Sequence, residues 1–288
     1  MSGGYILLCP NPQRDLGLEK TVYVRSLLER AGHCVRVSPF LGKGLEHTYP
    51  AGLTAEPLEQ VLEGAALAVT LGGDGTILRL VEVLQGRKIP ILGVNLGHKG
   101  FLTQLEADEV SGLLPAAAGN YSLQRRMMLD VQLLRRGRPV LRGCALNDAV
   151  VNGIVNTVRI AVFGDGRRIT EFSGDGIIVA SPTGSTAYSM AAGGPLVEPD
   201  AENILVTPIC AHWLSARSFV LAPERHVSVF PVELGEKQAL LSIDGGRKTP
   251  LQEGDEIRIC RSERATYMAL LDDWSFYSIV YEKLSDRT

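Results

Sequence analysis

The chain is poor in cysteine, and its few thiols are not arranged for cross-linking or metal binding. Its 288 residues include five cysteines, which are widely spaced and contain no C-x-x-C pair. This pattern indicates neither a disulfide framework nor a zinc site. We therefore expect reduced thiols within the core at Cys9, Cys34, Cys144, Cys210 and Cys260.

Long apolar runs, a targeting signal and a strong net charge are also lacking. Residues 1–10 have no basic segment and too short an apolar stretch for a signal peptide, and no later run approaches the ~20 residues of a membrane span. The formal charge of −3 is not the net positive charge that is typical of proteins binding nucleic acid or an anionic membrane. The basic run at 135–138 is typical of a solvated hairpin tip. We expect a cytoplasmic protein without nucleic-acid or membrane partners.

Two patterns divide the chain. Between residues 5 and about 105, short apolar runs alternate with helical patterns, which predicts βαβ units and a parallel sheet. From about residue 123, strand-length alternation with glycine turns predicts a mainly β half. The fold class is therefore a Rossmann-like α/β domain over 1–122, a mainly β domain over 123–261, and a C-terminal segment over 262–288 that returns to the first domain.

Individual elements follow from the same runs. In the first part, strands are predicted at 5–8, 35–38, 67–71 and 89–94, with helices near 17–32, 58–64 and 77–86. In the second part, strands are predicted at 129–134, 145–152, 158–163, 177–181, 227–231, 240–243 and 257–260, and a helix at 272–284. Asp165-Gly166 predicts a short hairpin turn.

The most informative segment is 69–78, where an apolar run breaks into Gly72-Gly73-Asp74-Gly75-Thr76 before a helical pattern. Glycines let backbone N–H groups approach a phosphate, and a helix N-terminus favours negative charge. A lone Asp there repels phosphate unless it binds a metal or takes a proton from an incoming hydroxyl. The loop thus indicates phosphoryl transfer, and a tight turn with a helix-capping Asp is the simpler alternative.

Other polar groups follow predicted strands. Ligands bind at the carboxyl ends of parallel strands, so residues 95–100 and 72–76 are expected to face one crevice. Arg79, one helical turn beyond Gly75, can neutralise phosphate charge or lie exposed. Asn147-Asp148 can bind ribose hydroxyls or form a strand-entry turn. Residues 182–189 are rich in hydroxyls and suit a nucleoside, or a turn that caps the next helix.

Four segments in this order resemble the NAD kinases of bacterial type. They are residues 72–76, residues 93–103, Asn147-Asp148 and residues 174–195, and the likeness extends to 242–245 and 274–277. The first segment is shared with lipid kinases and phosphofructokinases, whereas 174–195 is far more specific. The resemblance covers nearly the whole chain.

This resemblance implies transfer of the γ-phosphoryl group of ATP, or of another donor such as polyphosphate, to the 2′-hydroxyl of the adenosine ribose of NAD. A divalent cation such as Mg²⁺ is implied as cofactor, with no protein metal ligand assigned, and a homodimer or homotetramer is implied. Asp74 is then the proton acceptor. The implied substrate- and nucleotide-binding residues are Gly72, Gly73, Gly75, Thr76, Arg79, Asn95, Asn147, Asp148, Asp175, Thr186, Ala187, Tyr188 and Ser189.

The chain departs from the family pattern at three positions. Many members carry Glu at Asp148, a basic residue at Ser173 and Ser at Ala191. The first change keeps a carboxylate, while the others remove a charge and a hydroxyl, so no binding role is assigned to Ser173 or Ala191. Two alternatives stay open: a lipid or sugar kinase that shares residues 72–76, and a non-catalytic dinucleotide sensor. Binding alone gains nothing from Asp74 beside phosphates, which argues against the sensor.

Overall fold

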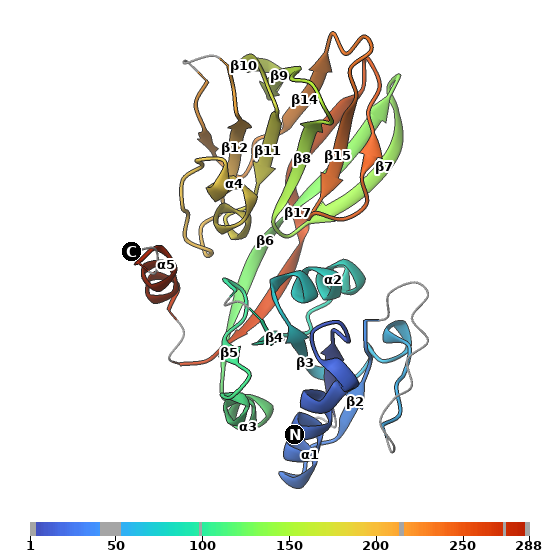
Figure 1. Cartoon of the computed structure of the whole chain (residues 1–288), viewed down its shortest axis with the longest axis vertical. Coiled ribbons are helices and arrows are strands. Elements are labelled where there is room, and N and C mark those ends of the chain that lie inside the picture. Colours follow the sequence, from blue (N-terminus) through green and yellow to red (C-terminus); the bar gives the residue numbers. More distant parts are fainter. Residues whose placement is uncertain (1–3, 41–52, 98–99, 213–215, 273–274, 286–288) are drawn as a thin grey trace. The chain divides into compact units, whose positions relative to one another are not determined.

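A computed structural model describes residues 4–40, 53–97, 100–212, 216–272 and 275–285 (Figure 1). The chain divides into two compact units. Unit 1 comprises residues 1–125 and 266–288, and unit 2 comprises residues 126–265. None of the helices in the described ranges is long and apolar enough to cross a membrane.

Unit 1 is built on a parallel sheet with the strand order β4-β3-β1-β2. Its strands are β1 (Tyr5–Pro10), β2 (Val35–Val37), β3 (Ala65–Gly72) and β4 (Ile91–Asn95), and the two-residue β5 (Leu105–Glu106) pairs with β4. β4 is buried throughout, as expected of strands covered on both faces. The predicted parallel sheet is confirmed.

The helices of unit 1 are short, and a glycine with positive φ follows two residues after the ends of α1, α2 and α3. They are η1 (Leu16–Leu18), α1 (Glu19–Arg30), η2 (Leu58–Gln60), α2 (Asp74–Leu84), η3 (Val110–Gly112), α3 (Leu113–Ala117) and α5 (Phe276–Ser285). The predicted helix at 58–64 is wrong, because only a 3₁₀ turn forms there. Pro57 precedes that turn and Gly64 adopts a φ of 90° before β3, which leaves too few residues for an α-helix.

The C-terminal helix belongs to unit 1. In α5, Ile279 is buried, and the Lys283 ammonium lies 4.3 Å from the centroid of the Phe101 ring. The prediction that the C-terminal segment returns to the first domain is therefore confirmed. Trp274, in one of the segments that carry the family resemblance, lies outside the described residues.

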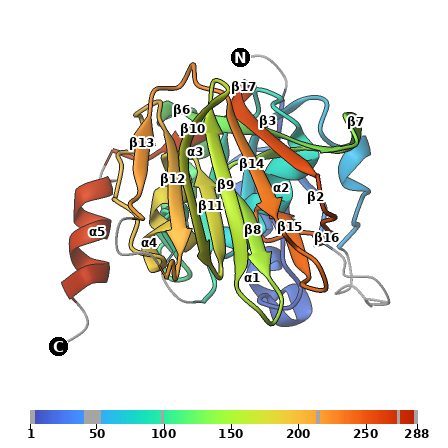
Figure 2. The same cartoon turned by 90° about the horizontal axis from the view of Figure 1, so that it is seen from above.

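Unit 2 consists almost entirely of strands, seen from above in Figure 2. One sheet has the order β13-β12-β11-β8-β15-β16, and the other strands pair in the order β10-β9-β14-β17, with β6 pairing both β17 and β7. The strands are β6 (Ser122–Arg135), β7 (Arg138–Ala145), β8 (Asp148–Gly153), β9 (Val158–Gly164), β10 (Arg167–Gly174), β11 (Gly176–Ala180), β12 (Ile204–Ile209), β13 (Phe219–Leu221), β14 (Val227–Val232), β15 (Ala239–Ile243), β16 (Thr249–Pro250) and β17 (Glu256–Leu270).

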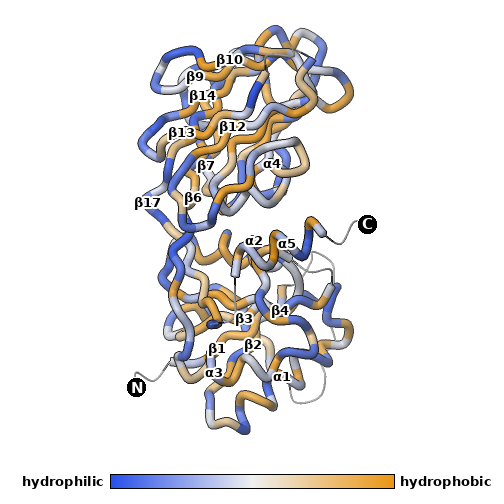
Figure 3. Tube along the Cα trace, turned by 90° about the vertical axis from the view of Figure 1, so that its left-hand side faces the viewer, coloured by the Kyte–Doolittle hydropathy of each residue, from blue (hydrophilic) through white to orange (hydrophobic). Residues whose placement is uncertain are grey.

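A core of aliphatic side chains joins the strands of unit 2. It includes Val151 and Val179 from one sheet and Ile160 and Ile257 from the other strands, all nearly inaccessible to solvent. Apolar segments run along the strands of both units in Figure 3. Two short helices, η4 (Thr183–Thr186) and α4 (Tyr188–Ala191), follow β11. The predicted mainly β half is confirmed.

Two predicted turns can be compared with the structure. Asp165 and Gly166 have φ angles of 49° and 77° between β9 and β10, so the predicted hairpin is confirmed. Arg136 and Gly137 form a similar tip, but Arg135 is not simply solvated, because it pairs with Asp255 at 2.8 Å.

The thiols are free, but most of them are not in the core. Cys9 is fully buried, and burial raises the pKa of its thiol. Cys144 and Cys260 are half-buried, and Cys34 and Cys210 are exposed. The predicted core location is therefore wrong for Cys34 and Cys210, which lie just before β2 and just after β12.

Candidate active site

The loops at the carboxyl ends of three neighbouring strands line one cavity in unit 1. Asn11 follows β1, Gly73 follows β3, and Asn95 ends β4. The cavity has a volume of about 340 Å³, and its lining residues are Asn11, Arg14, Gly72, Gly73, Asp74, Gly75, Thr76, Asn95, Gly97, Gly100 and Lys283. The prediction that residues 72–76 and 95–100 face one crevice is confirmed for the residues described, which exclude His98 and Lys99.

Backbone N–H groups clamp the Asp74 carboxylate. Phe101 donates to Oδ2 at 2.7 Å, and Leu102 and Thr103 donate to Oδ1 at 3.1 and 3.3 Å. Asp74 is also the first residue of α2, where the helix dipole favours a negative charge. A carboxylate offers about four acceptor positions, and Oδ2 receives only one of these bonds. The clamp therefore fixes the carboxylate while leaving Oδ2 able to accept another proton donor.

Gly100 allows the clamp to close. A Cβ atom on this residue would lie 1.9 Å from Asp74 Oδ1 and 2.8 Å from Thr103 Oγ1, which is too close for any other side chain. Gly100 belongs to a loop that the sequence predicts to face the crevice, but no role follows for it from the sequence. Its only signal was its place in the segment 93–103.

The buried side chains of Thr76 and Asn95 form hydrogen bonds within the loops that line the cavity. Thr76 Oγ1 accepts from the N–H of Gly73 at 3.3 Å, and Asn95 Nδ2 donates to Glu106 at 2.8 Å and to the carbonyl of Gly97 at 3.2 Å. Both side chains are buried. Their hydrogen bonds hold the cavity walls in place.

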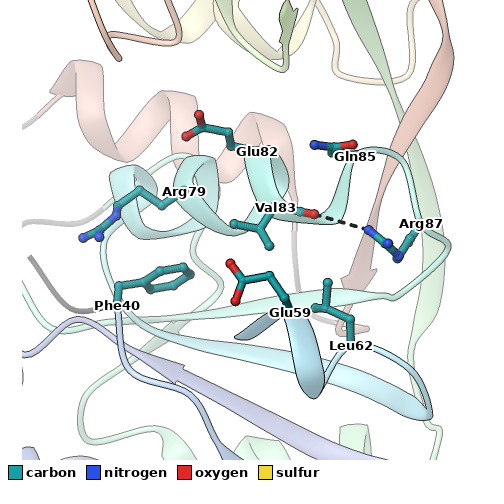
Figure 4. Close-up of a pocket in the computed structure, with 8 residues that line it drawn as sticks. All are labelled: Phe40, Glu59, Leu62, Arg79, Glu82, Val83, Gln85 and Arg87. Carbon is teal, nitrogen blue, oxygen red and sulfur yellow. Dashed lines mark hydrogen bonds between the residues drawn. The ribbon is translucent and has the colours of Figure 1, made fainter. Parts of the chain in front are cut away.

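Arg79 lies in a different hollow from Asp74. Its guanidinium carbon is 4.9 Å from the centroid of the Phe40 ring, beside Glu59 and Glu82, in a hollow of about 540 Å³ (Figure 4). Residues five positions apart on an α-helix point about 140° apart, so α2 directs Asp74 and Arg79 to different faces. The structure does not bring Arg79 to the carboxylate, and the cavity takes its described cations from Arg14 and Lys283 instead. Neither was singled out from the sequence.

In unit 2, one carboxylate organises the Asn147-Asp148 turn. Asp244 accepts from the N–H groups of Leu146, Asn147 and Asp148 at 2.7, 2.7 and 3.0 Å. Its own N–H donates to the Asp148 carbonyl at 2.9 Å. Such charge-assisted bonds are stronger than neutral ones and fix the turn. Asp244 was missed as a supporting residue, although 242–245 was among the segments resembling the family.

The structure brings Asn147 together with the hydroxyl-rich loop. Ser181 donates its N–H to the Asn147 carbonyl at 2.8 Å, and a Cβ on Gly184 would lie 2.1 Å from that same oxygen. The Oδ1 atom of Asn147 is buried and has no hydrogen-bond partner among the described residues. A buried acceptor without a donor is costly, so this atom is suited to a ligand hydroxyl.

Asp148 is a buried carboxyl group whose pKa is raised. It is 5% exposed, and burial, reinforced by the Asp244 carboxylate, raises its pKa to about 7. A small change in its surroundings therefore changes its charge near neutral pH.

The remaining residues that the sequence predicts to bind nucleotide lie at the two ends of β11. Thr186, Ala187 and Tyr188 are partly or fully exposed in the loop after β11, whereas Ser189 is buried and its hydroxyl bonds Thr207 at 3.0 Å. Asp175 lies at the opposite end of β11, because Gly176 pairs with Asn152 and Ala180 pairs with Asp148. A five-residue strand spans roughly 16 Å, so the structure does not bring Asp175 to the Asn147-Asp148 turn.

Known proteins resemble this chain along most of its length. Models of the ATP-NAD kinase N-terminal and C-terminal domains match residues 22–119 and 147–271. An NAD kinase of Natranaerobius thermophilus is 35% identical over 281 residues, covering 96% of both chains, and one of Symbiobacterium thermophilum is 39% identical over 253 residues, covering 84% of this chain and 88% of that protein.

Two solved structures are also similar. The crystal structure of yeast NADH kinase complexed with NADH matches with a TM-score of 0.84 and 28% identity over 99% of this chain and 89% of that one. An NAD kinase from Archaeoglobus fulgidus in complex with ATP matches with a TM-score of 0.74 and 25% identity, over 97% of this chain and 98% of that one.

Proposed function

Because the chain belongs to the ATP-NAD kinase family, we propose that the cavity beside Asp74 is where it transfers a phosphoryl group to NAD. The chain is an enzyme that phosphorylates NAD to NADP, and ATP is a phosphoryl donor. A lipid or sugar acceptor and a non-catalytic sensor are not favoured, since the relatives are NAD kinases along nearly the whole chain.

The clamped carboxylate of Asp74 is the observation that carries this proposal. Phosphoryl transfer requires positioning, charge neutralisation and one modest base. Asp74 takes the proton of the 2′-hydroxyl as its oxygen attacks the γ-phosphorus, while the N–H groups of Phe101, Leu102 and Thr103 hold the carboxylate in orientation. Gly72, Gly73 and Gly75 let phosphate oxygens approach the backbone at the start of α2.

A divalent cation is expected to reach this site together with a substrate. Within the part of the chain that the structure describes, no group of three or more His, Cys, Asp or Glu residues is placed to hold a metal ion. Mg²⁺ commonly binds through substrate phosphates and only one or two carboxylates. We therefore propose that it enters with ATP, held mainly by the phosphates.

The acceptor can be tested directly. Purified protein with Mg²⁺, NAD and ATP is expected to form NADP, followed by a coupled NADP-dependent dehydrogenase. Omitting NAD is the control for background reduction. Failure to form NADP with either ATP or inorganic polyphosphate, together with phosphorylation of a lipid or sugar, would contradict the proposal.

Asp148→Asn tests the ribose contact. We propose that the Asp148 carboxylate accepts from a ribose hydroxyl, so the substitution should weaken NAD binding by about 1.5–3 kcal/mol. Because the pKa of Asp148 is about 7, the carboxyl group is largely neutral below that pH. NAD affinity of the unmodified chain should therefore rise from pH 6 to pH 8, and that of the variant should not. Calorimetry that shows equal affinity in both proteins would return Asp148 to a purely structural role.

The assembly and location inferred from the sequence stay predictions. A homodimer or homotetramer would give twice or four times the chain mass in light scattering coupled to size exclusion, and a monomer would contradict that inference. A cytoplasmic location, the domain boundaries at 122/123 and 261/262, and the nucleotide contacts of Arg79, Asp175, Thr186, Ala187, Tyr188 and Ser189 are likewise predictions.

A further inference from the structure

We propose that Lys283, on the C-terminal helix, binds the phosphoryl group during its transfer. The inference rests on the proposed function, because it requires that the cavity beside Asp74 holds the reacting phosphates. It concerns a residue more than 200 positions away from the glycine-rich loop in the chain.

The position of Lys283 is the first observation. It lines the same cavity as Gly73, Asp74 and Gly75. It is half-buried, whereas Tyr281, Glu282, Leu284 and Ser285 around it in α5 are exposed. The helix therefore directs this one charged side chain toward the cavity.

Phe101 provides the second observation, because it holds both charged groups. The Lys283 ammonium lies 4.3 Å from the centroid of the Phe101 ring, and the Phe101 N–H donates to Asp74 Oδ2 at 2.7 Å. A cation over an aromatic face is attracted electrostatically by the ring. One residue thus fixes the base through its backbone and the ammonium through its side chain.

The charge balance of the cavity is the third observation. The reaction forms a bond from the 2′-oxygen to the γ-phosphorus, breaks the bond to the ADP oxygen and delivers the hydroxyl proton to Asp74. Negative charge accumulates on the transferred group and the leaving oxygen, and fixed cations stabilise it. Lys283 supplies one of these cations, since Asp74 contributes a carboxylate to the cavity and Arg79 lies in the other hollow.

Arg14 is the other described cation of the cavity, but it is placed differently. Its guanidinium lies 3.4 Å from where a Cβ of Gly97 would be, beside the loop that follows β4. The Lys283 ammonium is a compact point charge held beside the Phe101 ring, whereas the planar guanidinium of Arg14 is suited to bidentate contact with a phosphate. Lys283 is therefore the cation that we assign to the transferred group.

The test compares Lys283→Met, Lys283→Arg and the control Lys88→Met. Lys88 is an exposed lysine of unit 1 that lies outside the cavity lining. Lys283→Met is expected to lower kcat by about 10²-fold while changing the KM for NAD much less, because the lost interaction forms mainly in the transition state. Lys283→Arg should restore a large part of that loss, and Lys88→Met should match the unmodified chain.

Phe101→Leu tests the contact between the ring and Lys283 independently. The substitution removes the ring but keeps both the Lys283 ammonium and the backbone N–H of residue 101. It should also lower kcat, by less than Lys283→Met does, with the melting temperature as the check on folding. Retention of kcat in Lys283→Met, or an equal loss in the Met and Arg variants together with a lowered melting temperature, would overturn the proposal. If the unmodified chain makes no NADP, the proposed function itself fails, which is a separate result.

Discussion

Replacing Asp74 with Asn is expected to lower kcat by about 10²–10⁴-fold, the usual contribution of a general base. The amide is nearly the same size as the carboxylate but cannot accept the 2′-hydroxyl proton. The substitution also removes a negative charge beside the phosphates, so the affinity for ATP should hold or improve. Steady-state kinetics with both substrates at saturation measures the fall in kcat.

The clamp adds a structural consequence to this variant. An amide oxygen can still accept from Leu102 and Thr103, but the amide nitrogen would then face the N–H of Phe101. The loop after residue 100 should therefore lose one hydrogen bond, and the melting temperature should fall only slightly. A large fall would indicate that the variant has lost the fold of the loop, in which case the kinetic effect would not report on the base.

Gly100→Ala is expected to lower kcat by about 10²-fold without altering any group that reacts. The added methyl group would lie 1.9 Å from Asp74 Oδ1, so the carboxylate must move out of its N–H bonds. A displacement of about 1 Å at a reacting group can cost a rate factor of this size. Kinetics on the folded variant measure the effect, which should appear in kcat more than in the KM for NAD.

A methyl group at this position tests the clamp rather than the base. If Gly100→Ala keeps the kcat of the unmodified chain, then Asp74 does not need the orientation that its three N–H partners give it. The proposed role of the clamp would then be wrong, even if Asp74 still takes the proton.

The sequence predicts most of the parallel sheet and the helix α2, because strongly apolar runs separated by glycine are local signals, but α2 begins at Asp74, three residues before the predicted helix. It fails at 58–64, where apolar residues suggest a helix but Pro57 and Gly64 limit the segment to a 3₁₀ turn. Spacing along the chain shows how near two residues are but not which face of a helix each takes, so it does not reveal that Arg79 and Asp74 line different hollows.

The site is only partly visible in the sequence for a related reason. Asp74 stands out in its loop, but its partners Phe101, Leu102 and Thr103 act through backbone N–H groups, which leave no trace in residue type. Lys283 is an ordinary helix lysine until the fold places it beside Phe101.

In unit 2, too, the sequence indicates the polar residues but not their partners. The sequence marks Asn147 and Asp148 as polar residues that need partners, and the structure supplies Asp244, nearly a hundred positions later, as the acceptor for their N–H groups. Asp175 shows the reverse case. It precedes the hydroxyl-rich loop by only a few positions, yet a full strand separates the two.

Whether Asp74 takes the hydroxyl proton can be tested by single-turnover NADP formation and equilibrium binding of NAD and ATP, measured on one folded Asp74→Asn preparation. Both dissociation constants are expected to stay close to those of the unmodified chain while the single-turnover rate falls by at least about 10²-fold. A variant that binds NAD or ATP much more weakly but keeps its rate at saturation would show that Asp74 binds substrate and does not take the proton.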